Sequence, residues 1–380
     1  MQREKNPSTR HFSLRIIFFL LLIIVIAISL VVFVSLQKNA TEQPSSSSSS
    51  LLPGEKILKK GVSSYLFGTN NTYNWSSNNI ETNTIAQQYL RDAHIPLIRT
   101  WFFSPYSDYS NLATDAETDK RLQVDEAIGA QCLGVLQDTD PQSAQYYMHL
   151  VQYVGNRCLM YEFGNEPGAN GAPGIEHYIQ YWNALIPQLR KINANAKFGG
   201  PVGTISDIQT FLTATKQSGV LPDFLSFHNY NHDPAAYGQK VTQAKRLVKS
   251  ILGYELPVGI TEFNYDCCNS FNADSAAFET QYFTAVYNGL IAAHADFATE
   301  FDSMNHGGNN ELDMFDASAQ PRGVYTVIKN MIAQYSTVAS SPSTGPSNTL
   351  TAPSLVLIVF IIVFTLLILP FRRQRSKMKA

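Results

Sequence analysis

The sequence predicts an α/β fold, a (β/α)8 TIM barrel flanked by N- and C-terminal transmembrane helices. Between residues 55 and 335, short apolar runs alternate with longer amphipathic segments, which is the pattern of parallel strands joined by crossover helices. Eight such units fit a barrel, for which about 250 residues is a typical length. Two apolar stretches without charges, 16–36 and 350–370, lie outside this segment.

The predicted strands, in chain order, are 62–68, 96–103, 132–138, 158–164, 197–201, 223–230, 257–263 and 296–304. The predicted helices are 84–93, 119–129, 142–154, 175–192, 207–218, 237–252, 275–293 and 323–334. An open doubly wound sheet would alternate in the same way, but a glycine-rich phosphate turn would follow its first strand. The first predicted strand is followed instead by Thr-Asn-Asn-Thr-Tyr-Asn-Trp. This favours the barrel.

Both terminal apolar stretches have the length of a membrane span. Each contains 21 residues, and about 20 are needed to cross a bilayer. Basic tails, 1–15 and 371–380, lie outside them, so the positive-inside rule places both termini in the cytoplasm and the barrel outside the cell membrane. A cleaved signal peptide is the alternative for 16–36, although this run exceeds the usual apolar core of a signal and no A-x-A site follows it.

Low-complexity linkers connect the predicted spans to the barrel. A Ser-rich linker, 37–54, precedes the barrel domain, 55–335, and a Ser/Thr/Pro linker, 336–349, follows it; such compositions form flexible chains. Without residues 1–15 and 372–380 the chain has 19 Lys and Arg against 29 Asp and Glu. A domain this acidic is a poor partner for nucleic acid or anionic lipid. We therefore expect no nucleic-acid partner.

Two glutamates end apolar runs in the same way. Glu166 follows Asn165 just after the run 158–164, and Glu262 lies at the end of the run 257–263. The C-terminal ends of barrel strands meet at one mouth, so both carboxyl groups should face the same cleft. Acetal cleavage needs such a pair, one protonated to help the leaving oxygen depart and one ionised to attack the sugar or stabilise its oxocarbenium-like centre. The alternative is that each glutamate only pairs with a base such as Arg99.

Further candidates for substrate binding lie near the predicted strand ends: Arg99, Asn165, His228, Tyr230, Trp75 and Trp101. Arg99 would hold Glu262 ionised through its charge, or would form a structural ion pair. His228 and Tyr230 are two residues apart on a strand and share a face, which favours contact with substrate or with Glu262. The tryptophans could stack on sugars, although ordinary packing explains them equally well.

Four segments resemble motifs of clan A glycoside hydrolases, most closely the β-xylosidase and α-iduronidase family. The motifs are Asn-Glu-Pro, Gly-Gly-Pro, Phe-x-Ser-x-His-x-Tyr and Thr-Glu-Trp/Phe-Asn, and they lie within 163–167, 198–201, 223–230 and 260–264. Their order and spacing agree with the family over residues 61–334. The resemblance implies a (β/α)8 barrel and a retaining mechanism.

The resemblance also implies roles for single residues: Glu166 as the acid/base, Glu262 as the nucleophile and Asn165 as a ligand of the sugar 2-hydroxyl. The charge of Glu262 should then raise the pKa of Glu166, so that Glu166 holds a proton. Two departures alter the sugar subsite. Gly164 stands where a Trp often precedes Asn-Glu, and the eighth strand reads Phe-Asp-Ser-Met-Asn at 301–305, where family members often carry a Trp.

The predicted function is therefore that of a membrane-anchored, extracytoplasmic retaining glycoside hydrolase acting on an oligosaccharide, polysaccharide or glycoconjugate, with no cofactor and no metal. His228 and His232 are four residues apart but do not form a helical HExxH site, and no G-x-S-x-G elbow is present. The alternatives are a non-catalytic carbohydrate-binding or adhesion ectodomain on a TIM-barrel scaffold, and a membrane scaffold whose barrel is only structural.

The four cysteines fall into two pairs. Cys132 and Cys158 begin neighbouring predicted strands, and parallel strands lie about 4.8 Å apart, so a disulfide between them is geometrically feasible in an extracytoplasmic compartment. Cys267 and Cys268 are adjacent. A bridge between neighbours in sequence would be strained, and free thiols are expected there.

Overall fold

The computed structural model describes residues 51–71, 79–102, 113–136, 143–169, 174–266, 276–304 and 313–336. The two apolar stretches 16–36 and 350–370, Trp75 and the pair Cys267 and Cys268 lie outside these residues. Within the described residues, no helix combines the length and the apolar character that a bilayer crossing requires.

Eight parallel strands form a closed barrel in which β1 pairs with both β2 and β8. The strands are β1 (Gly68–Asn71), β2 (Leu97–Trp101), β3 (Gln131–Leu136), β4 (Met160–Phe163), β5 (Lys197–Gly203), β6 (Phe224–Tyr230), β7 (Val258–Asn264) and β8 (Phe297–Glu300). Strand order around the barrel follows chain order throughout. The predicted (β/α)8 barrel is confirmed.

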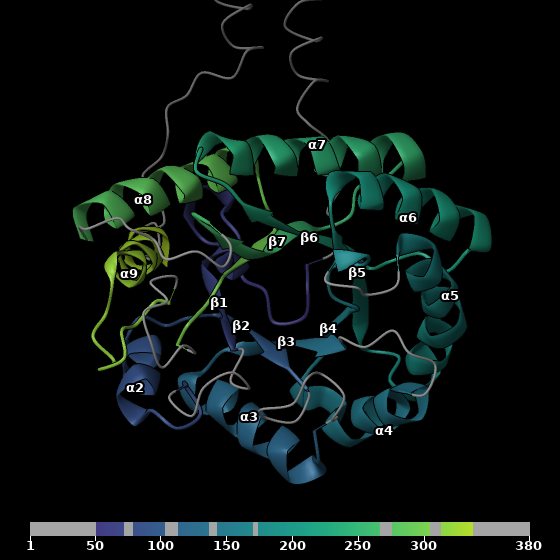
Figure 1. The fold of residues 1–380 in the computed structure, drawn as a ribbon, viewed down its shortest axis with the longest axis horizontal. Helices are drawn as coiled ribbons and strands as arrows, with labels where there is room; N and C mark the ends of the chain where they lie inside the picture. Colours follow the sequence, from purple (N-terminus) through teal and green to yellow (C-terminus); the bar gives the residue numbers. More distant parts are fainter. Residues whose placement is uncertain are drawn as a thin grey trace, which may run out of the picture.

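Helices surround the strands (Figure 1). They are α2 (Thr84–Asp92), α3 (Asp115–Ile128), α4 (Ala144–Val154), α5 (Ile175–Ile192), α6 (Ile205–Ser218), α7 (Ala235–Leu252), α8 (Ala276–Ala292) and α9 (Gly323–Ser336). The described residues also include the short 3-10 helices η1 (Lys59–Gly61), η2 (Ser64–Phe67) and η5 (Gly155–Arg157). Helix α3 begins four residues before its predicted start, because Thr114 and Glu117 form a capping box.

The first strand differs from its prediction. Residues 62–68 were expected to be extended, but Ser64–Phe67 forms the 3-10 helix η2 and the strand starts at Gly68. The side chain of Ser63 accepts a hydrogen bond from the backbone N–H of Tyr65, and this local contact competes with strand pairing. The chain therefore turns under the barrel before it enters it.

The barrel interior changes from apolar to polar along the strands. An apolar layer fills the N-terminal end; its residues are Leu52, Tyr65, Leu97, Leu133, Met160, Phe224 and Phe297. Along β2, side chains two residues apart share a face, so Arg99 lies one level above Leu97 and Trp101 lies above Arg99. A buried cation in the next level demands anionic partners nearby. This alternation brings charged groups into the upper half of the barrel.

Cys132 and Cys158 form a disulfide that joins the start of β3 to the residues before β4, with their Cα atoms 5.1 Å apart. The feasible bridge between these two strands is thus present. Both cysteines are buried in the main apolar core between barrel and helices. The bond closes a loop that contains all of α4.

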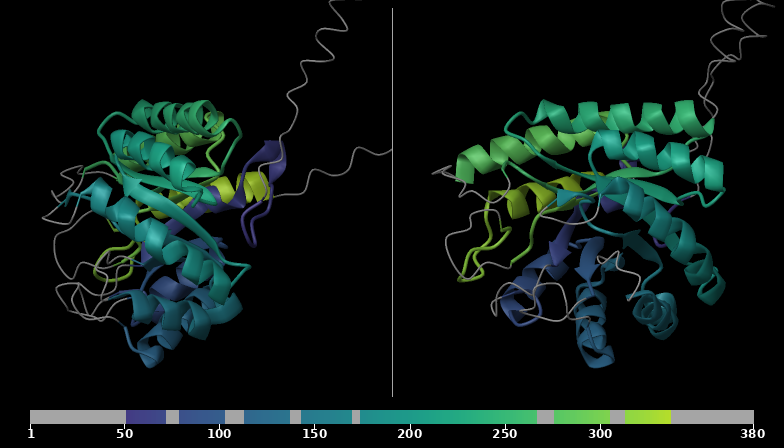
Figure 2. Two further views of the ribbon diagram at one scale, coloured as in Figure 1. Left: turned by 90° about the vertical axis from the view of Figure 1, so that its right-hand side faces the viewer. Right: turned by 45° about the vertical axis from the view of Figure 1, so that its right-hand side comes forward.

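Both ends of the described chain lie at the N-terminal face of the barrel. Gly54 and Ser336 line the same cavity there, which has a volume of about 320 Å³. In Figure 2, the purple N-terminal segment and the end of the yellow helix α9 lie side by side. The opposite face carries the C-terminal ends of the strands.

Candidate active site

Glu166 and Glu262 meet at the C-terminal ends of the strands. Glu262 lies in β7 and is 6% exposed, whereas Glu166 lies three residues beyond β4, with its backbone N–H donating to the carbonyl of Val202 at 3.2 Å. One carboxylate oxygen of each glutamate and one ring nitrogen of His228 lie within 4.8 Å of one another. The two carboxyl groups therefore face a common point, as the sequence predicts.

The positive φ of Glu166, 44°, is unusual for a residue with a side chain. Strained backbone of this kind is kept where surrounding contacts fix it, often at functional sites. Here the preceding Gly164, also at positive φ, ends the strand. This sharp turn places Glu166 at the C-terminal rim of the barrel.

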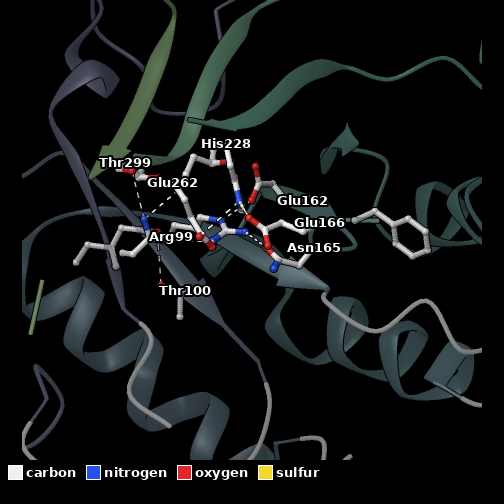
Figure 3. A network of polar contacts seen from close by, with 12 residues as sticks. Arg99, Thr100, Glu162, Asn165, Glu166, His228, Glu262 and Thr299 are labelled. Carbon is white, nitrogen blue, oxygen red and sulfur yellow. Dashed lines mark hydrogen bonds and ion pairs between the residues drawn. The ribbon is translucent and has the colours of Figure 1, made fainter. Parts of the chain in front are cut away.

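Arg99 is the centre of the polar network (Figure 3). Its fully buried guanidinium donates from Nε to Glu162 at 2.5 Å and from Nη1 to Glu262 at 2.5 Å. Nη1 also donates to Asn70 at 3.0 Å, and Nη2 donates to Asn165 at 2.9 Å. Burial alone would lower the pKa of Arg99, but the charges of Glu162 and Glu262 more than offset this and raise it. Arg99 is therefore a permanent cation between two carboxylates.

Glu262 has a second donor. The hydroxyl of Tyr230 donates to its Oε2 at 2.9 Å, while Nδ1 of His228 lies 3.5 Å from the same oxygen. Burial, and then the charge of Glu262, raise the pKa of Tyr230 well above its usual value, so the phenol keeps the proton that it donates. Arg99 and Tyr230 together fix both oxygens of Glu262.

The electrostatics of Glu166 differ from the expectation. Its Oε1 lies 2.8 Å from Nδ1 of His228, and this hydrogen bond, together with the charges of His228 and Arg99, lowers the pKa of Glu166 although burial opposes the shift. The prediction that Glu262 raises the pKa of Glu166 is therefore wrong for the structure as it stands. The closest group to Glu166 is a donor, and a donor favours the ionised form.

Trp101 lies inside the site, with the guanidinium of Arg99 4.8 Å from its ring centroid. Its side chain is buried, at 2% exposure. A ring that is covered and has a cation on its face has little surface for a sugar. This arrangement favours packing, one of the two roles considered for Trp101, and Trp75 lies outside the described residues.

Glu162 is a site residue that the sequence reasoning missed. It is fully buried in β4 and contacts Arg99 directly. A signal was present: Glu162 is the only charged residue in the apolar run 158–164, and it shares the inward face of the strand with Met160. A charge at an inward position needs a partner of opposite sign, and Arg99 is the inward cation of β2.

Among the described residues, one group has the spacing needed to hold a metal ion, and it consists of Glu166, His228 and Glu262. Two of its ligand atoms already have closer partners. Nδ1 of His228 contacts Glu166, and Oε2 of Glu262 accepts from Tyr230. A metal bound through Nδ1 of His228 would have to displace the first of these contacts.

The fold is a (β/α)8 barrel in which two carboxyl groups meet at the C-terminal ends of β4 and β7. Comparison with solved structures gives particular neighbours. A monomeric β-xylosidase from Caulobacter crescentus CB15 is similar with a TM-score of 0.60 and 12% identity, over 71% of this chain and 68% of that one. A glucosidase from Croceicoccus marinus has a TM-score of 0.59 and 15% identity, over 71% and 66%.

A family 39 glycoside hydrolase from Bacteroides cellulosilyticus WH2 is also similar, with a TM-score of 0.57 and 15% identity, over 70% of this chain and 63% of that one. The chain thus spans less than two thirds of the glucosidase and of the family 39 enzyme. No family model and no curated protein matches the sequence. At these identities the likeness establishes a shared fold. One of these neighbours is a β-xylosidase, and the four motifs resemble those of the β-xylosidase and α-iduronidase family.

Proposed function

We propose that this chain is a retaining glycoside hydrolase that cleaves O-glycosidic bonds by double displacement. The observation that carries the proposal is the spacing of Glu166 and Glu262, whose nearest oxygens lie within 4.8 Å. Retaining enzymes hold their carboxyl groups about 5 to 5.5 Å apart, whereas inverting enzymes leave about 6.5 to 9.5 Å for a water. The shorter spacing supports direct attack on the sugar. The fold shared with a β-xylosidase and a glucosidase supports the same chemistry.

In the proposed mechanism, Glu262 attacks the anomeric carbon while Glu166 gives its proton to the leaving oxygen. The first step leaves a glycosyl ester on Glu262. Glu166 then takes a proton from the water that cleaves this ester. Asn165 accepts from Arg99 through its carbonyl oxygen, which leaves its amide N–H groups to donate to a sugar hydroxyl.

The stereochemical course tests the proposal directly. Full-length protein in detergent is incubated with a panel of aryl β-glycosides, and NMR identifies the first-formed anomer. Retention is expected. Inversion would contradict the assignment of Glu262 as nucleophile, whereas binding to glycans without any hydrolysis would favour the carbohydrate-binding ectodomain.

Glu166→Ala should lose activity in proportion to the leaving group's need for a proton. General acid catalysis contributes about 10² to 10⁴-fold, so we expect a loss of this size for alkyl glycosides and a small loss for dinitrophenyl glycosides, which depart as stable anions. The measurement is kcat/KM across a series of leaving groups. Glu176→Ala, a change at an exposed residue of α5, is the matched control. Equal losses on all substrates would remove Glu166 from the acid role.

The dependence of activity on pH should follow the contact between Glu166 and His228. Because the pKa of Glu166 is lowered, chiefly by His228, its protonated form exists only on the acidic side of the usual range for Glu. The value of kcat/KM, which reports the free enzyme, should therefore fall as pH rises through that lowered pKa. His228→Phe removes the main cause and should move this alkaline limb to higher pH. His232→Ala, at an exposed ring, should leave the limb in place.

We further propose that the barrel is anchored outside the cell membrane through 16–36 and 350–370, with both termini cytoplasmic. The charge-free stretches and their basic flanks support this topology. Protease added to intact cells should degrade the barrel and spare tags at both termini. Loss of the N-terminal tag alone would indicate a different topology for the first stretch.

A further inference from the structure

Glu162 has an unusual environment for a buried carboxylate. It is fully buried in β4, and its Oε2 accepts from Nε of Arg99 at 2.5 Å. Its other oxygen, Oε1, is also buried and has no hydrogen-bond partner among the described residues. An unpaired buried acceptor costs stability. The contact with Arg99 therefore satisfies only one of the two oxygens of this carboxylate.

We infer that Glu162 is a positioning residue for the hydrolase reaction, because it shares the charge of Arg99 with the nucleophile Glu262. The inference rests on the proposed function of Glu262. In this arrangement Glu162 sets how strongly Arg99 holds the nucleophile. It does so without touching the substrate.

The geometry divides one positive charge between two negative ones. Arg99 contacts Glu162 and Glu262 at the same distance, 2.5 Å, through different nitrogens. Both carboxylates are buried, at 0% and 8% side-chain exposure, so their interactions with Arg99 are weakly screened. Without the charge of Glu162, Arg99 would stabilise ionised Glu262 more strongly. A carboxylate held more strongly attacks the anomeric carbon less readily.

The reaction cycle gives the second reason for a charge at this place. When Glu262 forms its ester with the sugar, the bond from sugar to leaving group breaks, the leaving oxygen takes the proton of Glu166, and Glu262 loses its charge. If Glu162 were absent, the buried cation Arg99 would then contact no carboxylate, which is a costly state. Glu162 keeps Arg99 paired throughout the life of this intermediate.

Two substitutions separate the charge of Glu162 from its shape. Glu162→Gln keeps an acceptor oxygen for Nε of Arg99 and removes the charge, whereas Glu162→Asp keeps the charge at a shorter reach. Glu300→Gln is the matched control, because Glu300 is likewise fully buried, in β8, and does not contact Arg99. Burial, and then the charges of Asp302 and Asp313, raise the pKa of Glu300 well above its usual value, which favours the neutral form that Gln resembles.

Among the described residues, the titratable groups that face Glu262 are Arg99, Tyr230, His228 and, through His228, Glu166. With full-length protein and an aryl glycoside, Glu162→Gln should lower kcat/KM about 10 to 100-fold and move the acidic limb of its pH profile to lower pH. Glu162→Asp should keep the acidic limb of the wild type, and Glu300→Gln should change neither quantity. A profile of Glu162→Gln that superimposes on the wild type, or one matched by Glu300→Gln, would overturn the inference.

A second measurement separates this inference from the proposed function. If the wild type hydrolyses no glycoside, the proposed function fails, but Arg99 still contacts both carboxylates. The NMR resonance of the Arg99 Nη1 proton that donates to Glu262 should move in Glu162→Gln, because this contact strengthens when Arg99 no longer shares its charge. An unmoved resonance, in a variant whose circular dichroism shows that it is folded, would refute the charge-sharing role by itself.

Discussion

Replacement of Glu262 by Ala should abolish turnover, with a fall in kcat on the order of 10⁶-fold, as when the nucleophile of a serine protease is removed. The proposed ester forms on this carboxylate alone, and both of its oxygens are already oriented by Arg99 and Tyr230. The measurement is kcat on an activated aryl glycoside. Glu300→Gln, the buried carboxyl of β8, serves as control and should retain full activity.

Small anions give this prediction a positive readout. Azide can enter the space that the truncated Glu262 side chain leaves and attack the sugar from the same side. The product should be a glycosyl azide of inverted configuration, seen by NMR. Removal of a nucleophile costs much more than a hundredfold in rate. If Glu262→Ala retains more than about one hundredth of the wild-type rate without azide, Glu262 is not the nucleophile.

Arg99→Met should have the second largest effect, on stability as well as activity. It leaves Glu162 and Glu262 buried beside each other without their shared cation, and breaking a buried ion pair in this way costs about 3 to 5 kcal/mol. The measurement is urea unfolding at pH 7. Arg99→Lys restores the charge but lacks the planar fork that reaches several acceptors, so it should recover stability only in part.

The loss in Arg99→Met should also depend on pH, with a defined sign. Burial and mutual repulsion make the two orphaned carboxyl groups hold protons more readily in the folded than in the unfolded state. Stability of the variant is then greatest below the ordinary range of Glu and falls as pH rises. The difference from the wild type should be larger at pH 7 than at pH 4. A difference that is independent of pH would mean that Arg99 acts mainly through packing.

The sequence predicts the barrel and its main carboxyl pair because each depends on local patterns. Asn165 and Glu166 directly follow one predicted strand and precede a proline, which places them at the rim, and Glu262 lies near the end of a second predicted strand. No knowledge of packing is required for that step. The resemblance of four motifs assigns catalytic roles to these residues but does not predict the distances between them.

The missed features depend on how the strands are staggered and on single contacts. Arg99 pairs in register with Leu133, which pairs with Met160, so the partner of Arg99 inside the barrel, Glu162, lies two residues further along β4. The sequence of a single strand does not specify how that strand is staggered against its neighbours. The lowered pKa of Glu166 likewise depends on one ring nitrogen at 2.8 Å, which spacing along the chain does not specify.

The position of the two ends of the described chain has a consequence for which glycans the proposed hydrolase could reach. Residues 51 and 336 leave the barrel at the face opposite the catalytic mouth. In the proposed topology each is joined to its predicted membrane span by 13 or 14 residues, which can reach at most about 50 Å. Two connections at one face keep that face toward the membrane, so the C-terminal ends of the strands would face away from the cell. Glycans of the surroundings or of a neighbouring cell would then be in range, and headgroups of glycolipids in the same membrane would not.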